Sequence, residues 1–246
     1  MRQGQSDTVS VWQWIGQVTE GSAGSIGAFL GWAGGFVVGI DDPETRRQVA
    51  FSMALIALAA KMAKADGVVT VDEEAAFRRL FDVPVSEQRN VGRLFNLAKR
   101  DVAGFDAYAA QIARLYSDDC SALEDVLDGL FMIAEADGAV HEAELAYLED
   151  VAVILGFTEA AFERIVARHV VPEEGDPYLV LESDRDWPLS EIRTQFRRLV
   201  ADNHPDRLIG RGMPVEFIAI ANDRLAAINV AWERVKKERA GGPRPE

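Results

Sequence analysis

Apolar residues recur at intervals of three to four over residues 44–170, the spacing that places them on one face of an α-helix. No stretch of this region shows the strict alternation of apolar and polar residues that is typical of a half-buried strand. The positions that carry the helical pattern are Val49, Met53, Ile56, Ala60, Ala63, Phe77, Leu80, Val91, Leu94, Phe95, Ala98, Tyr108, Ile112, Leu115, Leu123, Val126, Leu127, Leu130, Ile133, Leu148, Val151 and Ile154. The pattern predicts an all-α fold whose helices bury these stripes against one another.

The same region contains an internal repeat, in which the second copy lies 71 residues after the first. Each copy consists of a helix, an Ala-Asp-Gly tripeptide, a short turn and an acidic helix start. The corresponding positions are Ala63, Ala65, Asp66, Gly67, Val69, Glu73 and Phe77 in the first copy and Ala134, Ala136, Asp137, Gly138, Val140, Glu144 and Leu148 in the second. The repeat predicts a helical bundle with an internal duplication.

A second pair of apolar stripes follows near the C-terminus. The first stripe comprises Leu189, Ile192, Phe196 and Leu199, and the second comprises Phe217, Ile220, Leu225, Ile228, Trp232 and Val235. Two stripes joined by a loop too polar to bury predict an antiparallel helical hairpin. Because Pro205 fixes its own backbone torsion and biases His204 away from the helical region, the first helix should end abruptly there.

The residues at this helix end are the main candidates for a binding site. The tripeptide His204-Pro205-Asp206 would form a stiff, exposed corner, which loses little entropy on binding. Arginines of the preceding helix offer fork-shaped donors for the carboxylates of a partner, although arginines on a helix are also typical of a solvated face. The candidate partner-binding residues are His204, Pro205, Asp206, Arg193, Arg197 and Arg198.

This C-terminal segment resembles the J-domain, the module with which co-chaperones of the DnaJ family engage a DnaK-type chaperone. The resemblance covers residues 176–239 and includes, besides the corner, the helix start Asp176-Pro177 with Tyr178 and Leu181, the run 196–199, and the closing run 228–232 with Trp232 in place of the usual tyrosine. The loop 207–214 is similar to that of the DjlA subgroup, whose members also carry a helical domain ahead of the J-domain. The resemblance implies that the chain accelerates ATP hydrolysis by its partner and is not itself an enzyme.

Two positions depart from the family pattern. Asp202 stands where the family often has a basic residue, and Asn203 stands where it often has an aromatic one. These departures leave a second reading open, in which the J-domain is degenerate and the chain is a metal-binding helical scaffold at the membrane. No phosphate-cradling glycine loop or nucleophile elbow supports a hydrolase or transferase.

The repeat resembles the TerB-like family of helical domains associated with tellurite resistance, in which each half carries Ala-Asp-Gly and a glutamate seven residues after the aspartate. The resemblance covers residues 44–170 and implies a site of four carboxylates, provided that the two copies pack about a pseudo-twofold axis. Oxygen ligands of this kind suit a hard divalent cation such as calcium. The candidate metal ligands are Asp66, Glu73, Asp137 and Glu144.

A purely structural role explains the same residues. Gly67 and Gly138 follow helices at the position that favours a left-handed cap. Thr70 and Glu73 form a capping-box pair, so Glu73 would accept from a backbone amide, whereas His141 at the equivalent place makes this explanation weaker for Glu144. The sequence leaves both readings open, and no other cofactor is required.

Charge and cysteine content narrow the functional classes. The net charge is −14, and residues 1–175 carry all of it, whereas residues 176–239 are neutral overall. An acidic chain is a poor ligand for nucleic acid, which is therefore not an expected partner. The single Cys120 excludes an internal disulfide and fits a reducing compartment. His169, one of only three histidines, is expected on an exposed helix end, where a cation is favourable.

An uncharged, glycine-rich segment occupies residues 21–40. Twenty residues at helical rise reach across a bilayer core, and glycine at every fourth position from 27 to 39 would let two such helices dimerise. Trp12, Trp14 and Trp32 would then lie at the interface, and Arg46 and Arg47 would keep the remainder cytoplasmic, with residues 21–40 anchored in the inner membrane. The high glycine content fits a flexible or surface-lying arm equally well.

The chain is therefore divided into a glycine-rich N-terminal segment (1–43), a TerB-like domain (44–170), a linker (171–175), a J-domain (176–239) and a disordered tail (240–246). The expected function is that of a J-domain co-chaperone for a DnaK-type chaperone. The TerB-like domain would serve localisation, client binding or metal binding.

Overall fold

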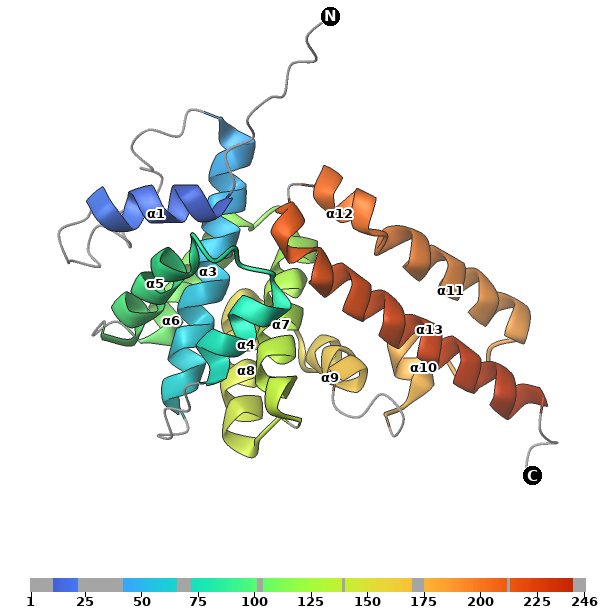
Figure 1. Ribbon diagram of the computed structural model, residues 1–246. Helices are drawn as coiled ribbons and strands as arrows, with labels where there is room; N and C mark the ends of the chain where they lie inside the picture. Colours follow the sequence, from blue (N-terminus) through green and yellow to red (C-terminus); the bar gives the residue numbers. More distant parts are fainter. Residues whose placement is uncertain are drawn as a thin grey trace, which may run out of the picture.

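The computed structural model describes residues 11–21, 42–65, 72–100, 104–138, 140–169, 175–211 and 213–240 (Figure 1). Every regular element within these ranges is a helix, which confirms the predicted all-α class. The helices are α1 (Val11–Gly21), α3 (Pro43–Ala65), α4 (Asp72–Leu80), α5 (Gln88–Arg100), α6 (Phe105–Leu115), α7 (Cys120–Ala134), η1 (Glu135–Asp137), α8 (Glu142–Leu155), α9 (Glu159–His169), α10 (Pro177–Val180), α11 (Leu189–Asp202), α12 (Pro205–Gly210), η2 (Val215–Phe217) and α13 (Ile218–Ala240).

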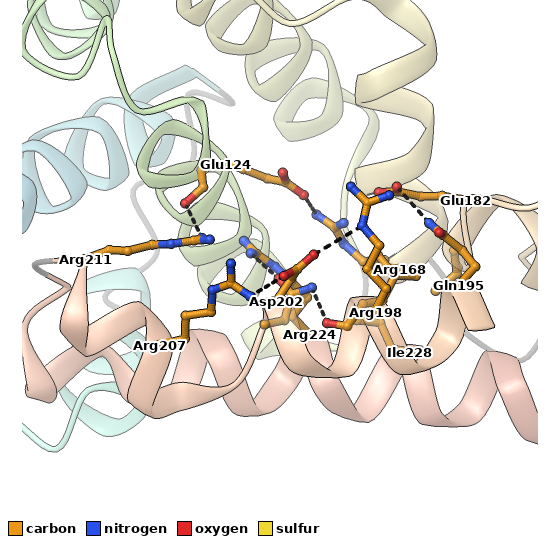
Figure 2. Close-up of a pocket in the computed structure, with 14 residues that line it drawn as sticks. Glu124, Arg168, Glu182, Gln195, Arg198, Asp202, Arg207, Arg211, Arg224 and Ile228 are labelled. Atoms are coloured by element: carbon orange, nitrogen blue, oxygen red, sulfur yellow. Dashed lines mark hydrogen bonds and ion pairs between the residues drawn. The ribbon is translucent and has the colours of Figure 1, made fainter. Parts of the chain in front are cut away.

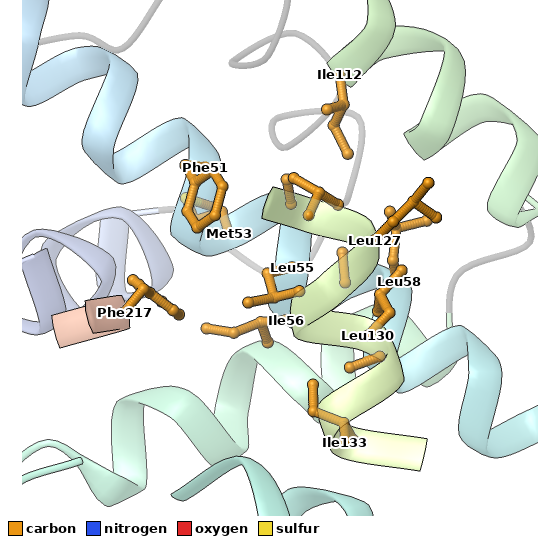
Figure 3. Close-up of a cluster of buried hydrophobic side chains, with 14 of the residues drawn as sticks. Phe51, Met53, Leu55, Ile56, Leu58, Ile112, Leu127, Leu130, Ile133 and Phe217 are labelled. Atoms are coloured by element: carbon orange, nitrogen blue, oxygen red, sulfur yellow. The ribbon is translucent and has the colours of Figure 1, made fainter. Parts of the chain in front are cut away.

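Helix α3 lies at the centre of an N-terminal bundle formed by α1 and α3–α9. It is apolar on nearly all sides, and almost every side chain from Val49 to Met62 is buried. Helices α1 and α4–α8 pack against it. Figure 3 shows leucines of α3 and α7 side by side in this core, and the hydroxyl of Tyr147 on α8 donates to the carbonyl of Leu58 at 2.9 Å. Burial of an all-round apolar helix is therefore what holds the bundle together.

Helix α1 belongs to this bundle, although it lies upstream of the predicted domain start. Trp12 and Ile15 are fully buried, and the ring of Trp12 lies 6.0 Å from that of Phe77 and 5.4 Å from that of Phe217. The prediction that Trp12 lies at a membrane interface is therefore wrong. Residue 43 does not divide α1 from the helices that follow, because α1 packs against both α3 and α5.

The rest of the glycine-rich segment, residues 22–41 with Trp32, lies outside the described residues. Among the helices that are described, none combines the length and the apolar character that a bilayer-spanning helix needs. The predicted membrane anchor and the predicted dimer through the glycines therefore stay predictions.

The second copy of the repeat has the predicted course. Helix α7 runs into the short η1, which ends at Gly138 with φ +117°, a conformation that favours glycine. Helix α8 then begins after His141. In the first copy, Asp66 and Gly67 lie outside the described residues, while α4 contacts α7 and η1 of the second copy. The two copies are thus packed against each other within one bundle.

Helices α10–α13 form the predicted hairpin. Asp176 caps α10 by accepting a hydrogen bond from the amide of Tyr178 at 2.9 Å, and Pro177 occupies the first helical position. Helices α11 and α13 then pack through Phe196 and Trp232, whose rings stack at 5.0 Å with an interplanar angle of 12°. This second core also contains Tyr178, Val180, Leu181, Ile192, Leu199, Ile228, Ala231 and Val235.

Helix α13 contributes to both cores. Its first turns, with Ile220 and Ala221, are buried in the N-terminal bundle, whereas Ile228 and Val235 further along are buried in the hairpin. In Figure 1, α13 correspondingly runs from the bundle outward along α11. The division into a domain at 44–170 and a separate domain at 176–239 therefore does not follow the packing, because one continuous helix serves both.

The connection between the hairpin helices also differs from the prediction of a loop too polar to bury. Residues 205–210 form helix α12, and Leu208 and Met213 are buried in the core of the N-terminal bundle. Burial of these two apolar side chains holds the start of the connection against α13 and the bundle. The corner that precedes α12 is consequently attached to a rigid support.

Candidate functional site

The corner, residues 204–206, is exposed as predicted. Helix α11 ends at Asp202, and His204 caps the following helix α12, since its Nδ1 accepts a hydrogen bond from the amide of Asp206 at 3.2 Å. The side chains of His204 and Asp206 are 55% and 89% exposed. Because Pro205 is the first residue of α12, its fixed torsion and absent amide hydrogen are accommodated without loss. The corner thus presents an imidazole and a carboxylate on a short, restrained turn.

The three candidate arginines are all exposed on α11, but they do not form one group. Arg193 and Arg197 are one helical turn apart, and neither forms an ion pair with any of the described residues. Arg198 forms an ion pair with Asp202, with 3.5 Å between its Nε and the carboxylate oxygen. Arg193 lies nine residues before Asp202, which is about 14 Å along the helix. Of these three arginines, Arg198 alone forms an ion pair within the described part of the chain, and its partner Asp202 lies two residues before the corner.

The two residues that depart from the J-domain pattern both form specific contacts beside the corner. Asp202 pairs with Arg198 and also with Arg207 of α12. The amide nitrogen of Asn203 donates to the carbonyl of Leu199 at 2.8 Å, and its oxygen accepts from Nη1 of Arg224 at 2.9 Å. Since Arg224 is buried on α13, Asn203 connects the corner to the interior of the protein.

Behind the corner lies a group of buried charges, which we call the charge cluster. It joins three helices and consists of Asp125 and Asp128 on α7, Arg168 and His169 on α9, and Arg224 on α13. Asp128 is its centre, because it accepts from Nη2 of Arg168 and from Nε2 of His169, both at 2.9 Å, and from Arg224. Asp125 accepts from Nη2 of Arg224 at 2.7 Å.

Burial and pairing set the protonation of these groups. Burial raises the pKa of Asp128, but the charges of Arg168, Arg224 and His169 outweigh it and hold this pKa well below its usual range. Burial raises the pKa of Asp125 to about 6, against the opposing effect of Arg224. Burial lowers the pKa of His169, yet hydrogen bonds to Asp128 and Glu135 prevail and raise it to about 9. His169 is therefore a buried cation at neutral pH.

The position of His169 corrects the sequence prediction. His169 does end a helix, but its side chain is buried rather than exposed, with Nδ1 3.1 Å from a carboxylate oxygen of Glu135. Its ring stacks on Phe131 at 4.9 Å and 6°. The reason is that α9 ends against α7, where Asp128 supplies the counter-charge. Exposure was inferred from the helix end alone, and packing against another helix overrides that inference.

Sequence reasoning missed the charge cluster as a whole. The available signal was the occurrence of Asp125 and Asp128 within the otherwise apolar run of α7, where acidic residues are costly to bury without partners. The partners Arg168 and Arg224 lie 40 to 99 residues away in sequence, so no local pattern identifies them. Because a buried, multiply bonded arginine links α13 to α7, the cluster fixes the hairpin in one position on the bundle.

The predicted metal ligands are only partly within the described residues. Asp66 lies outside the described residues. Glu73 and Asp137 belong to described helices, but their side chains are not described. Glu144 is buried and accepts a hydrogen bond from the amide of His141 at 2.9 Å, which is the helix-capping role considered as the alternative. The described residues contain no group of three or more acidic, histidine or cysteine side chains suited to a metal. The calcium site stays a prediction.

Comparison with known proteins identifies two kinds of similarity, one to a family model and one to whole curated proteins. The family model described as "Tellurite resistance protein TerB" matches residues 52–167, which lie within the N-terminal bundle. The chain is 25% identical to "Co-chaperone protein DjlA" of Photobacterium profundum over 232 residues, covering 84% of this chain and 83% of that protein. It is 24% identical to proteins of the same name from Vibrio vulnificus and Legionella pneumophila, covering 80% and 76% of both chains. No solved structure matches.

The fold and the site together define the class as all-α proteins in which a TerB-type bundle carries a C-terminal helical hairpin with an exposed His-Pro-Asp corner. The matches extend over both parts of the chain. The chain accordingly resembles the DjlA co-chaperones over most of its length, as its sequence predicted.

Proposed function

We propose that this chain is a DnaJ-type co-chaperone that binds a DnaK-type chaperone through the corner and α11 and stimulates its ATP hydrolysis. The observation that supports the proposal best is the exposed His204-Pro205-Asp206 at the end of an arginine-bearing helix. The chain's likeness over most of its length to proteins named co-chaperone DjlA agrees with this role. The proposal makes the chain a non-enzyme, since the ATPase site belongs to the partner.

The physical basis of the stimulation is differential binding. A co-chaperone shifts the partner toward the conformation to which it binds more tightly, and only by as much as the two affinities differ. His204 offers an imidazole and Asp206 a carboxylate on a turn that α12 restrains, so little conformational entropy is lost on contact. Arg193 and Arg197, which form no ion pair with the described residues, supply unpaired guanidinium groups for carboxylates of the partner.

The bundle has a supporting role in this proposal. Arg224 bonds to Asn203 beside the corner and to Asp125 and Asp128 in the bundle. The orientation of the corner relative to the bundle is therefore set, and a client or membrane surface held by the bundle would be presented to the chaperone in a defined geometry.

The test is a single-turnover ATPase assay of a DnaK-type chaperone with the full-length chain. His204→Gln removes the imidazole but keeps a polar side chain, and we expect it to abolish stimulation while helicity by circular dichroism is unchanged. His141→Gln is the matched control, because His141 is the other exposed histidine and lies at the start of α8, in a different part of the fold. Full stimulation by the His204→Gln protein would disprove the proposal.

A further inference from the structure

A cleft of about 260 Å³ lies between the hairpin and the N-terminal bundle, directly beside the corner (Figure 2). Five arginines from α9, α11, α12, the α12 C-cap and α13 line it: Arg168, Arg198, Arg207, Arg211 and Arg224. The acidic side chains in its lining are Glu124, Glu182 and Asp202. The cleft is thus a concave surface rich in guanidinium groups, built by helices that are far apart in sequence.

The two buried arginines form the inner part of the cleft. Arg224 is fully engaged, because its Nε, Nη1 and Nη2 all donate to Asp128, Asn203 or Asp125. Arg168 donates from Nη2 to Glu124 at 2.6 Å and to Asp128 at 2.9 Å. The side chain of Arg168 is only 8% exposed, and its Nε finds no acceptor among the described residues. Because this Nε has almost no accessible surface, the donors that a ligand in the cleft can reach are mainly those of the exposed arginines.

The three exposed arginines form the rim. Arg198 and Arg207 share the single carboxylate of Asp202, and Arg211 donates from Nη1 to the neutral hydroxyl of Ser121 at 3.1 Å. Figure 2 shows Arg198 and Arg207 on either side of Asp202. Each guanidinium carries five N–H donors, so most rim donors are left without a partner among the described side chains. The rim therefore carries three guanidinium groups, whereas Asp202 and Glu182 are the acidic side chains of the lining that the two buried arginines do not bond.

We propose that the cleft binds a multivalent oxyanion of the phosphate type. Guanidinium groups match phosphate oxygens in bidentate geometry, and several converging arginines favour a ligand with more than one charge. A volume of 260 Å³ compares with about 30 Å³ for one water molecule, so a diphosphate group fits with part of its hydration shell. The binding itself does not depend on the proposed co-chaperone function.

The ligand would also affect the corner. Asp202 and Asn203 immediately precede His204, and two of the three rim arginines, Arg198 and Arg207, pair with Asp202. An anion that draws Arg198 into the cleft removes it from the surface offered to a chaperone. Occupancy would therefore weaken the chaperone contact, and this consequence alone rests on the proposed function.

The test is calorimetric titration of the full-length chain with pyrophosphate at low ionic strength. We expect binding that Arg207→Gln combined with Arg211→Gln weakens about tenfold or more, since each charge-assisted hydrogen bond contributes at least a factor of this order. The matched control is Arg193→Gln combined with Arg197→Gln, which removes the same charge from exposed positions of α11 outside the cleft lining. The affinity of this control variant for pyrophosphate should stay within about twofold of the wild-type value. Arg211→Ala, which among the described residues loses the side-chain bond to Ser121 and no other, provides a second cleft variant if the double variant unfolds.

A second arm distinguishes the source of the phosphate. The same proteins are floated with vesicles of phosphatidylglycerol and phosphatidylcholine. If pyrophosphate binding is lost in the cleft variants but not in the control variant, the ligand is a free phosphate. If pyrophosphate does not bind, and the wild-type protein floats with the vesicles whereas the cleft variants do not, the ligand is a lipid headgroup. Absence of both, or an equal loss in the cleft and control variants, overturns the proposal. Because neither arm contains a chaperone, failure here leaves the ATPase test of the proposed function unaffected.

Discussion

Replacement of Arg224 by methionine tests whether the charge cluster holds the hairpin on the bundle. Methionine retains the length of the aliphatic stem while the guanidinium is lost. The substitution removes the bonds to Asp125 and Asp128 on α7 and the bond to Asn203 beside the corner. Asp128 keeps Arg168 and His169 as partners, whereas Asp125 loses the only cation that bonds to it among the described residues.

The magnitude follows from the burial of the pair. The side chains of Arg224 and Asp125 are 3% and 5% exposed, so water cannot replace the lost contact. Removing one partner of a buried ion pair costs about 3–5 kcal/mol, because the other charge stays buried without compensation. For a chain of this size, such a loss lowers Tm by roughly 10 °C. We therefore expect Arg224→Met to destabilise the full-length protein by about 3–5 kcal/mol near pH 7.5.

The assay is urea unfolding followed by circular dichroism. Lys236→Met on the same helix is the control, since Lys236 forms an exposed pair with Glu233 and should cost less than about 1 kcal/mol. Adding Asp125→Asn to Arg224→Met removes the stranded carboxylate and should restore roughly 1–2 kcal/mol. A loss below about 1 kcal/mol for Arg224→Met, or no recovery in the double variant, would refute the argument that this buried pair fastens the hairpin.

Three further predictions concern His169, the hairpin and the arginines of α11. The pKa of His169 is raised to about 9 in the folded protein, so its stabilising effect is fully present below its unfolded value of 6.5 and is lost as the pH rises through 9. The free energy of unfolding should therefore fall by about 3 kcal/mol between pH 6.5 and about 9.5. This fall should be absent in the His169→Gln variant, and an unchanged pH dependence in that variant would contradict the assignment. A fragment of residues 176–239 should bind a hydrophobic dye and melt without a sharp transition, because Leu208, Phe217 and Ile220 lose the bundle that buries them. A cooperative melt equal to that of the full chain would show that the hairpin folds independently. Arg197→Gln combined with Arg198→Gln should raise the concentration needed for half-maximal ATPase stimulation about tenfold and reduce its salt dependence, and an unaltered salt response would exclude these arginines from the contact.

Local features of the sequence were enough to predict the all-α class and the exposed corner, although helices α1 and α12 were not predicted. The three-to-four spacing of apolar residues predicted the all-α class, and Asp176-Pro177 predicted the start of the hairpin. Gly138 predicted the left-handed end of η1, and Pro205 predicted the interruption after α11. Each of these features acts within one helical turn or one cap, so the residues involved are neighbours in the chain.

The contacts that position the corner could not be predicted in the same way. Their partners are 21 to 99 residues apart, as with Asn203 and Arg224 or Asp125 and Arg224, and no short pattern connects them. For the same reason the buried state of His169, the burial of Leu208 and the place of Trp12 in the bundle core were wrongly predicted or missed.

The amino-acid sequence by itself therefore determined that the fold is helical, where most of the longer helices lie and which residues the corner presents. Only the tertiary structure decided that a single helix, α13, belongs to both cores and that Arg224 joins them through buried carboxylates. The physical reason is that helix formation depends on neighbouring residues, whereas the cost of burying a charge is offset only by a partner that folding brings from elsewhere in the chain.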